Sequence, residues 1–430
     1  MRISIIGTGY VGLTAGVGLA SKEHDVKCVD IDEKKVEQIN EGVCPIYEED
    51  LPELMEETIS NERLEASLDT KEAVRNSEVT FLCVGTPRQE DGTINLENIK
   101  KAARDAAEGL KEKDEFHMFV VKSTVIPGTT EDQIIPILEK ETGKEVGEDF
   151  GVCMNPEFLR EGNALDDFLN PDRIVIGEYD EKSGDILEQI YTDFETQILR
   201  TSLKAAELIK YASNSLLATK VSFINEIGNL CKELNIDVYE VADGIGLDER
   251  VNREFLDSGP GWGGSCFPKD VNALISFMSE KGVDSQVLES VIRQNEDHKT
   301  KLVELLEDEI DVSGKRIAIL GLAFKPGTDD IRNSPAIDII EELKEKDAKV
   351  KAYDPQAMEN MQDIHKDIEY TDSAAEAMKD SHAALIVTHW DEFHDLTMQD
   401  LDEMEKPLVV EGRKMDYDIL EEHTKGITWP

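Results

Sequence analysis

The sequence predicts an α/β protein: two doubly wound parallel-sheet domains joined by a helical central domain with a long spine helix. Three observations predict this class. Apolar strand-like segments alternate with helical segments over about the first 195 residues, the alternation returns after residue 313, and the stretch between them is helical. Such alternation is typical of parallel sheets whose strands are joined by right-handed crossovers.

The first predicted domain comprises residues 1–195. Its apolar, β-branched runs predict strands, and small-residue or amphipathic stretches between them predict helices. The expected strands are 2–7, 25–32, 78–85, 117–124 and 150–156, and the expected helices of the first half are 13–22 and 31–40.

The predicted central domain, residues 196–312, begins with one long helix. Residues 203–234 keep helical apolar spacing without a proline, and further helical sequence follows at 270–282 and 285–309. A helix of this length can serve as a spine between domains. It also offers a natural dimer surface, so we expect a homodimer or a larger homo-oligomer.

The third predicted domain, residues 313–430, repeats the α/β pattern. Its expected strands are 315–324, 349–355, 383–390 and 407–413, with a helix at 336–347.

The net charge is the unusual property of the composition. The 430 residues include 93 acidic and 46 basic residues, a formal charge of −47, and the acids are spread along the chain. Such a charge opposes compaction unless salt screens it, and the screening length falls to about 3 Å at 1 M salt. We therefore expect a halophilic protein, the alternative being an acidic mesophilic enzyme. The same charge should repel nucleic acid, so we expect no nucleic-acid partner.

The cysteines and the amino terminus predict a cytoplasmic location. Six cysteines without a CxxC pair in a chain of this length indicate a reducing compartment. The opening MRISIIGTGYVG is typical of a strand entering a turn and not of a signal peptide, and no apolar run approaches the roughly 20 residues of a membrane helix.

A GxGxxG motif follows the first predicted strand and opens a helix. Gly7 permits a tight turn, Gly9 lets the main chain approach a pyrophosphate, and Gly12 allows close helix–strand packing. Asp30 ends the next strand, at the spacing of a ribose-binding acid, which favours NAD over NADP; Lys35 nearby weakens that preference slightly. The alternative is a tight turn without a ligand. We predict that both sheet domains are Rossmann-like, the first from this motif and the third from its repeated strand–helix pattern.

Two threonines also follow apolar strands. Thr86 and Thr124 are expected at the carboxyl edge of the sheet, where ligands of open α/β folds bind. Each hydroxyl could equally cap the main chain at the start of a loop.

The stretch GPGWGGSCFPKD, residues 259–270, surrounds one cysteine with glycines. Lys269 can lower the pKa of the Cys266 thiol toward a usable thiolate, and the glycines let the main chain crowd a ligand. The other cysteines mostly lie in apolar segments, as structural cysteines do. A dehydrogenase needs a thiol when an aldehyde must be oxidised further, because the thiol adds to the aldehyde and the adduct can become a thioester.

Two polar pairs have helical spacing. Lys210 and Asn214 share a face of the predicted spine helix, where their ordinary interpretation is a solvated side and the functional one is stabilisation of an alkoxide. Glu157 and Glu161 are also four residues apart. They can form a solvated helix start or a coupled pair in which one pKa is raised.

The third domain has no GxGxxG motif after its first strand. Lys325 and Arg332 bracket PGTDDI there, and Arg413 follows a later strand. In so acidic a chain, basic residues at strand ends predict a pyrophosphate site.

Seven motifs in order along nearly the whole chain resemble the UDP-glucose 6-dehydrogenase family of nucleotide-sugar dehydrogenases. They are GTGYVG, VGTP, STVIPGT, NPEFLREGNALDDFLNPDRIVIG, ELIKYASNSLLATKVSFINEIG, GPGWGGSCFPKD and AFKPGTDDIRNSP. The resemblance implies two successive NAD-dependent oxidations at the sugar C6, which turn UDP-glucose into UDP-glucuronate.

The resemblance also implies roles for individual residues. Cys266 matches the nucleophile, Asp270 a residue that assists water in the thioester step, Lys210 and Asn214 the pair that holds the C6 oxygen, and Glu157 and Thr124 residues that position water or relay protons. Positions that match or are expected for the cofactor are Gly7, Gly9, Tyr10, Val11, Gly12, Asp30, Lys35, Thr86, Thr124, Glu161, Lys269 and Arg332. Those for the substrate are Glu157, Phe158, Leu159, Arg160, Lys210, Asn214, Arg250, Phe255, Leu256, Asp257, Ser258, Gly259, Gly263, Lys325 and Arg413, with Arg250 contributed across a dimer interface and no residue assigned to a metal.

Three other functions remain open at this stage. A sister enzyme acting on GDP-mannose or a UDP-N-acetylhexosamine would use the same cysteine, and Trp262, where relatives usually carry phenylalanine, alters the volume beside the sugar pocket. A one-step hydroxyacid dehydrogenase would form one NADH per substrate instead of two. A non-enzymatic NAD-binding protein would tolerate loss of Cys266.

We predict that activity depends on salt. Two anionic ligands must reach a strongly anionic protein, so activity should fall steeply on dilution from molar salt to about 0.1 M, where the screening length is about 10 Å. The measurement is the initial rate across this range. A flat profile would contradict the halophilic assignment and leave the enzyme assignment untouched.

Overall fold

The computed structural model describes residues 1–415 and 423–430, and the chain forms two compact units, Met1–Ser213 and Asn214–Pro430. The boundary between the units falls inside one helix, α9 (Leu203–Leu234). This division does not test the three predicted ranges 1–195, 196–312 and 313–430, which stay predictions; the last of them includes 416–422, which lie outside the described residues.

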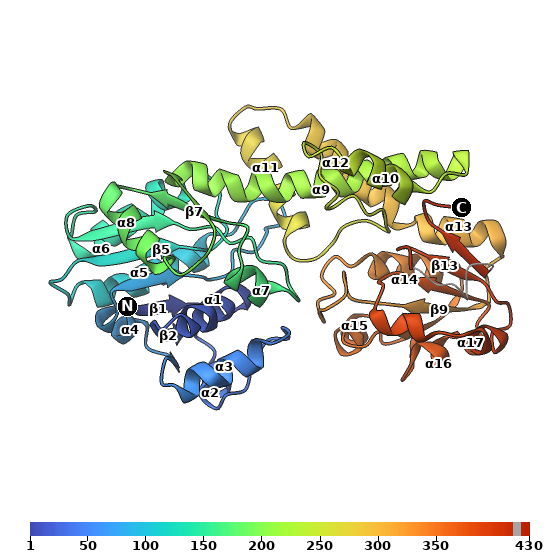
Figure 1. Ribbon diagram of the computed structural model, residues 1–430, viewed down its shortest axis with the longest axis horizontal. Helices are drawn as coiled ribbons and strands as arrows, with labels where there is room; N and C mark the ends of the chain where they lie inside the picture. Colours follow the sequence, from blue (N-terminus) through green and yellow to red (C-terminus); the bar gives the residue numbers. More distant parts are fainter. Residues whose placement is uncertain (416–422) are drawn as a thin grey trace. The chain divides into compact units, whose positions relative to one another are not determined.

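The first unit contains an eight-stranded sheet in the order β3-β2-β1-β4-β5-β6-β7-β8 (Figure 1). Its strands are β1 (Arg2–Ile6), β2 (Asp25–Val29), β3 (Leu64–Ser67), β4 (Val79–Leu82), β5 (His117–Val121), β6 (Phe150–Met154), β7 (Arg173–Glu178) and β8 (Gln197–Ser202). The helices are α1 (Tyr10–Ser21), α2 (Glu33–Asn40), α3 (Leu51–Ser60), α4 (Thr70–Asn76), α5 (Glu97–Leu110), the π-helical turn η1 (Thr130–Ile134), α6 (Ile135–Thr142), α7 (Ala164–Leu169) and α8 (Glu181–Ile190).

Helices pack in groups around this sheet. Helix α1 contacts α3 and α7, whereas α4 packs on α5 and α5 on α6. Successive side chains of β1 face opposite sides of the sheet. Ile3 and Ile5 join the apolar core that includes α1, whereas the Ser4 hydroxyl contacts the Ser77 hydroxyl. The predicted α/β class is confirmed, and the five predicted strands are present.

One strand pair runs differently from the predicted parallel pattern. β6 and β7 are antiparallel, with Met154 opposite Gly177, whereas the other pairs of this sheet are parallel. A parallel partner needs a crossover to the other end of the sheet. The segment between β6 and β7 contains only the six-residue α7, and it begins and ends at the carboxyl edge of β6. Residues 155–172, which carry Glu157 and Glu161, therefore stay at that edge.

Among its described residues, the second unit contains a six-stranded parallel sheet in the order β11-β10-β9-β12-β13-β14. Its strands are β9 (Arg316–Leu320), β10 (Lys349–Tyr353), β11 (Glu369–Tyr370), β12 (Ala383–Ile386), β13 (Val409–Glu411) and β14 (Thr424–Gly426). The helices after α9 are α10 (Val238–Gly246), α11 (Phe267–Glu280), α12 (Gln286–Lys299), α13 (Lys301–Glu309), α14 (Pro335–Glu345), α15 (Met358–Ile364), α16 (Ala374–Met378), the 3-10 turn η2 (Asp391–Asp395) and α17 (Met398–Asp402).

Both faces of this second sheet are buried. In β9, Ile317 and Ile319 join the core that includes α13 and α14, while Ala318 and Leu320 join the core that includes α16 and α17. Alternation of this kind is the pattern of a doubly wound sheet with helices on both sides.

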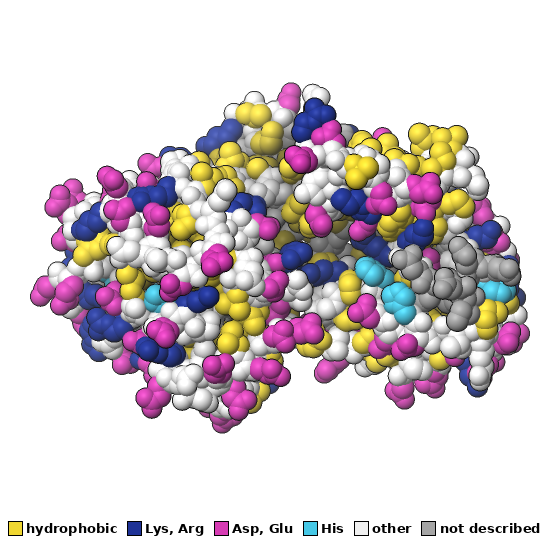
Figure 2. All heavy atoms as spheres, viewed as in Figure 1, with side chains coloured by type: hydrophobic (Ala, Val, Ile, Leu, Met, Phe, Trp, Pro, Cys, Tyr) yellow, Lys and Arg dark blue, Asp and Glu magenta, His cyan; other side chains and the backbone are white. Residues whose placement is uncertain are grey.

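The charge is distributed over the surface. Figure 2 shows acidic side chains scattered across the visible face of both units, with no single acidic patch. Among the described residues, no helix combines the length and apolar character that crossing a membrane requires.

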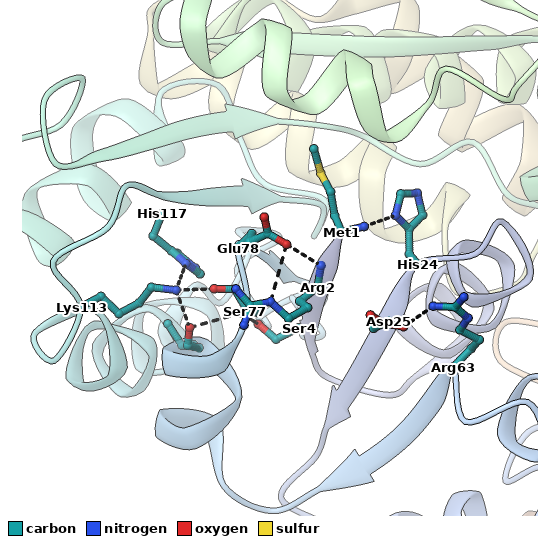
Figure 3. A network of polar contacts seen from close by, with 11 residues as sticks. Met1, Arg2, Ser4, His24, Asp25, Arg63, Ser77, Glu78, Lys113 and His117 are labelled. Atoms are coloured by element: carbon teal, nitrogen blue, oxygen red, sulfur yellow. Dashed lines mark hydrogen bonds and ion pairs between the residues drawn. The ribbon is translucent and has the colours of Figure 1, made fainter.

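A buried polar network crosses the first sheet near the amino end of β5 (Figure 3). Lys113 Nζ donates to the carbonyls of Val74 and Ser77, at the end of α4, and lies 3.0 Å from Nδ1 of His117. Burial, then the Lys113 charge, holds the pKa of His117 well below its usual value, so its Nδ1 accepts and its Nε2–H donates to Thr80 Oγ1 at 2.8 Å.

We predict that Lys113→Met destabilises the first unit by about 1 to 3 kcal/mol, because two carbonyls at the end of α4 and a ring nitrogen lose their donor. Denaturant unfolding measures the loss. The control is Lys111→Met, which removes only an exposed pair with Glu108 and should change stability by less than about 0.5 kcal/mol. Equal effects of the two substitutions would contradict the capping role.

Candidate active site

The turn after β1 needs two of its glycines for packing. Gly7 has φ +98°, and a Cβ there would lie 3.0 Å from the carbonyl oxygen of Cys83. A Cβ on Gly12 would lie 1.8 Å from the carbonyl oxygen of Gly7. The protein's own main chain therefore excludes side chains at both positions.

Gly9 is different, because a Cβ there would meet no described protein atom within 4 Å. It is the N-cap of α1, the first turn of which contains no acidic residue. The first N–H groups of a helix have no partner within the helix, and with the helix dipole they favour an anion. The open space beside Gly9, with Tyr10 and Val11 next in the chain, fits the pyrophosphate of a dinucleotide cofactor.

Asp30 lies beside this turn, at the end of β2. Its Oδ2 accepts from the Thr8 N–H at 2.8 Å and from the Thr8 hydroxyl at 2.6 Å, and its Oδ1 accepts from the Asp32 N–H. Burial alone would raise the pKa of Asp30, but these hydrogen bonds, with the Lys35 charge, hold it below its usual value. The carboxylate is therefore ionised and fixed in orientation. The next residue, Ile31, leaves 89% of its surface exposed, a feature that we did not predict.

The two predicted threonines are joined to each other. The hydroxyl of Thr86 donates to the carbonyl of Thr124 at 2.7 Å, so it caps the main chain, as one of the two interpretations expected. The loop that carries Thr124 is held from α9, because the Glu207 carboxylate accepts from the N–H groups of Gly128 at 2.5 Å and Thr130 at 2.8 Å. Burial raises the pKa of Glu207 to about 7. The only sequence signal for these two hydrogen bonds was the position of Glu207 among apolar residues of the predicted helix.

Glu157 forms a buried ion pair with Lys210 of α9. Lys210 Nζ lies 2.9 Å from Glu157 Oε1, and the two side chains are 3% and 7% exposed. Burial would raise the pKa of Glu157, but the Lys210 charge and hydrogen bond, followed by the Leu159 N–H, hold it below its usual value. Lys122 is also buried nearby and donates to Asn155 Oδ1 at 2.9 Å.

The interpretation of Glu157 and Glu161 as a solvated helix start was wrong. Residues 155–160 form no helix, so the spacing of four does not place these side chains on one helix face. The charge that sets the pKa of Glu157 belongs to Lys210, a contact between distant parts of the chain that spacing could not reveal.

The three residues that follow Glu157 are held in different ways. The guanidinium of Arg173 lies 3.9 Å from the centre of the Phe158 ring. Leu159 is half-buried, and Arg160 forms a bidentate pair with Asp167.

Cys266 is the N-cap of α11 and is half-buried. Its Sγ lies 3.5 Å from the Ser265 hydroxyl. The amino terminus of a helix stabilises a thiolate, and we did not predict this second source of positive potential. Pro268 in the first turn is a sequence signal for a helix start that could have revealed it.

Lys269, the cation that we expected beside the Cys266 thiol, forms an ion pair with Asp270. Lys269 Nζ lies 2.5 Å from Asp270 Oδ1, and the Asn214 amide donates to Asp270 Oδ2 at 2.6 Å. Asp270 is 1% exposed and Asn214 is 6% exposed. Lys210 and Asn214 lie one turn apart on α9 and are both buried, so their ordinary interpretation as a solvated side was wrong.

The predicted sugar segment is tightly packed in the second unit. Phe255 has φ +62°, and Leu256 is 2% exposed. Ser258 Oγ and the Gly259 N–H both donate to Asn225 Oδ1 at 2.9 Å. A Cβ on Gly263 would lie 2.0 Å from a carbonyl oxygen, so packing by itself demands that glycine.

Two of the three predicted pyrophosphate cations share a pocket. Lys325 and Arg413 line it together with His389, and Arg413 also donates to the Asp257 carbonyl at 3.2 Å. Burial, with the Arg413 charge, lowers the pKa of His389 to about 4, so its imidazole is neutral at pH 7. Arg332 is not among the lining residues and forms a bidentate pair with Asp330.

Arg250 lies on the surface. Its side chain is 89% exposed and pairs with Asp248. Within this chain it contacts none of the predicted site residues through a hydrogen bond or ion pair that the structure identifies.

Three family models match the chain. Residues 1–195 match the NAD binding domain of the UDP-glucose/GDP-mannose dehydrogenase family, residues 204–297 its central domain, and residues 318–416 its UDP binding domain.

Individual proteins are similar over nearly the full length. The UDP-glucose 6-dehydrogenase AglM of Haloferax volcanii is 44% identical over 420 residues, which cover 96% of this chain and 97% of that protein. A UDP-glucose dehydrogenase structure from Pyrobaculum islandicum has a TM-score of 0.93 at 38% identity, covering 100% and 98% of the two chains. A UDP-D-ManNAc dehydrogenase structure from Pyrococcus horikoshii has a TM-score of 0.87 at 29% identity, covering 100% and 99%.

We predict that Glu157→Gln costs about 3 to 5 kcal/mol at pH 7, because it leaves the buried Lys210 ammonium without its counter-charge. Folding lowers the pKa of Glu157. The ion pair therefore stabilises the folded protein at pH values above the ordinary carboxyl pKa, and this stabilisation is lost as the pH falls through the pKa of the folded state. The difference between wild type and variant in denaturant unfolding should therefore shrink in acid.

The control is the double variant Glu157→Gln with Lys210→Met, which removes both charges and should recover part of the loss. A difference that does not change with pH would contradict the ion-pair account.

Proposed function

Because the chain belongs to the UDP-glucose/GDP-mannose dehydrogenase family, we propose that it oxidises UDP-glucose at C6 to UDP-glucuronate with two molecules of NAD. The substrate is supported by the full-length likeness to a protein named UDP-glucose 6-dehydrogenase. The chemistry rests on one observation above all, the position of Cys266 at the amino terminus of α11.

The cofactor binds at the first turn of the first unit. Gly9, Tyr10 and Val11 face the pyrophosphate with their N–H groups, Asp30 accepts from the ribose hydroxyls, and exposed Ile31 offers an apolar surface to the adenine. NAD supplies the acceptor for a hydride in each of the two oxidations. The fixed, ionised carboxylate of Asp30 disfavours a 2′-phosphate.

In the first oxidation, Lys210 and Asn214 hold the C6 oxygen and stabilise its negative charge as the hydroxyl proton leaves. Glu157, ionised beside Lys210, relays that proton with Thr124 and water. The hydroxyl proton and one hydride leave the substrate, and an aldehyde remains.

In the second oxidation, the Cys266 sulfur bonds to the aldehyde carbon and the carbonyl oxygen takes a proton, giving a thiohemiacetal without any change in oxidation state. Loss of a second hydride from C6 and of the hydroxyl proton leaves a thioester. Water then adds, the carbon–sulfur bond breaks, and the acid and the free thiol are released.

Asp270 assists this water. Its carboxylate accepts from Asn214 and Lys269, so it is held in one orientation close to the start of α11. By resemblance, Lys269, Glu161 and Arg332 serve the cofactor.

The nucleotide diphosphate binds in the second unit. Lys325 and Arg413 supply charge in one pocket, in a chain that otherwise repels anions. The segments Phe158–Arg160 and Phe255–Gly259, with Gly263, serve the sugar and its nucleotide.

We place the enzyme in the cytoplasm as a homodimer or larger homo-oligomer. No disulfide joins any of the six cysteines, as expected in a reducing compartment. Leu216, Phe223, Leu230 and Leu234 are exposed along α9 at near-helical spacing, and an apolar stripe of this kind suits a partner helix. Exposed Arg250 is available to a second copy.

We predict that the wild type forms two NADH per UDP-glucose consumed, and that Cys266→Ala forms no uronate. Absorbance at the NADH band and product mass, recorded together on a panel of nucleotide sugars, measure both quantities and separate UDP-glucose from GDP-mannose and UDP-N-acetylhexosamines. The control is Cys44→Ala, because Cys44 is similarly half-buried and has no role here. One NADH per sugar from the wild type would indicate a single-step dehydrogenase and overturn the proposal.

A further inference from the structure

The glycine loop, residues 258–265, carries few side chains that could fix its position. It is held instead by three asparagine amides from separate parts of the chain: Asn225 of α9, Asn295 of α12 and Asn333 between β9 and α14. Asn225 accepts from the Gly259 N–H, and Asn333 donates to the Gly264 carbonyl at 3.1 Å. Asn225 and Asn295 are at most 1% exposed.

Asn295 makes the most complete contact of the three. Its Oδ1 accepts from the Trp262 N–H at 2.7 Å, and its Nδ2 donates to the Trp262 carbonyl at 3.0 Å. One amide thereby satisfies both main-chain polar groups of a single loop residue. Buried main-chain groups that lose such partners are costly, so this contact strongly favours one loop position.

The side chain of Trp262 is fixed as well. Its Nε1–H donates to the Ser222 hydroxyl at 2.9 Å, and the indole belongs to an apolar cluster with Val271 and Val291. Val271 follows Asp270 on α11, and Val291 lies on α12, the helix of Asn295. Trp262 therefore connects the loop to α11, the helix whose N-cap is Cys266.

The residues around Trp262 have little freedom to move. Gly261 has φ +111°, and a Cβ there would lie 2.9 Å from Asn295 Oδ1. On the other side, the Gly264 N–H donates to the Arg332 carbonyl at 2.8 Å. A shift of Trp262 is therefore passed along a tightly packed main chain toward Cys266.

We propose that Asn295 is a positioning residue: by holding both main-chain groups of Trp262, it sets the position of the glycine loop and so of the Cys266 sulfur toward the aldehyde. The inference rests on the proposed function. Asn295 touches no reacting atom in this account. Asn295 affects the fraction of the aldehyde that reacts with Cys266 before it dissociates from the enzyme.

An aspartate could not replace the amide, although it has the same size. A carboxylate keeps an acceptor for the Trp262 N–H but has no donor for the Trp262 carbonyl, and it would set two oxygens against each other. Asn295→Asp is therefore a substitution of one hydrogen-bonding group with almost no change in volume.

The test is aldehyde leakage from Asn295→Asp. With the loop displaced by about 1 Å, uronate formation should fall by about 10- to 100-fold. The NADH yield should fall from two toward one per sugar, and hydroxylamine should trap the released aldehyde as its oxime, identified by mass. The affinity for NADH, measured by fluorescence, should not change.

The matched control is Leu343→Ala, which opens a cavity in the core beside α14 and destabilises the second unit without touching the loop. It should keep two NADH per sugar at temperatures where it is folded. If Asn295→Asp does not fold, Ser222→Ala removes the hydroxyl that accepts from the indole and donates to the Val291 carbonyl. It should give a smaller leak of the same kind.

The outcomes separate the two proposals. Two NADH per sugar and no trapped aldehyde in the folded Asn295 or Ser222 variant would overturn the positioning role while leaving the proposed function intact. One NADH per sugar in the wild type would instead overturn the proposed function.

Discussion

The sulfur of Cys266 lies where a short glycine loop meets the first turn of α11, and the proposed chemistry depends on that junction. The helix terminus supplies positive potential to a thiolate. The loop brings no bulky side chain between the sulfur and a substrate except Trp262, which is turned into an apolar cluster. An ordinary buried cysteine has neither property, as Cys28 and Cys83 illustrate, because burial raises the pKa of each to about 12.

Local order also fixes two carboxylates of the proposed mechanism, one in each unit. Asp270 is buried between Asn214 and Lys269, which hold its carboxylate in one orientation four residues after the sulfur. In the first unit, the antiparallel turn from β6 to β7 keeps the segment of Glu157 at the carboxyl edge of the sheet, where Lys210 neutralises it. Each of the two carboxylates is buried and paired with a lysine.

Much of this arrangement was predictable from local sequence. The glycine turn, Asp30 and the spine helix have short-range signals in spacing and composition, and the structure contains them. The antiparallel β7, the Glu157–Lys210 pair and the asparagines around the glycine loop were not predictable, because each depends on contacts between residues far apart in the chain. Pro268 was a local signal that we did not use, although it marks the start of α11, the helix whose N-cap is Cys266.

The central claim is that a half-oxidised sugar becomes covalently attached to one cysteine. The most direct measurement is mass spectrometry of peptides after acid quench of the enzyme during turnover with UDP-glucose and NAD, using Asp270→Asn to slow thioester hydrolysis. The account predicts an added UDP-sugar mass on the peptide that contains Cys266 and on no other cysteine. Turnover without any adduct, or an adduct on a different cysteine, would contradict it.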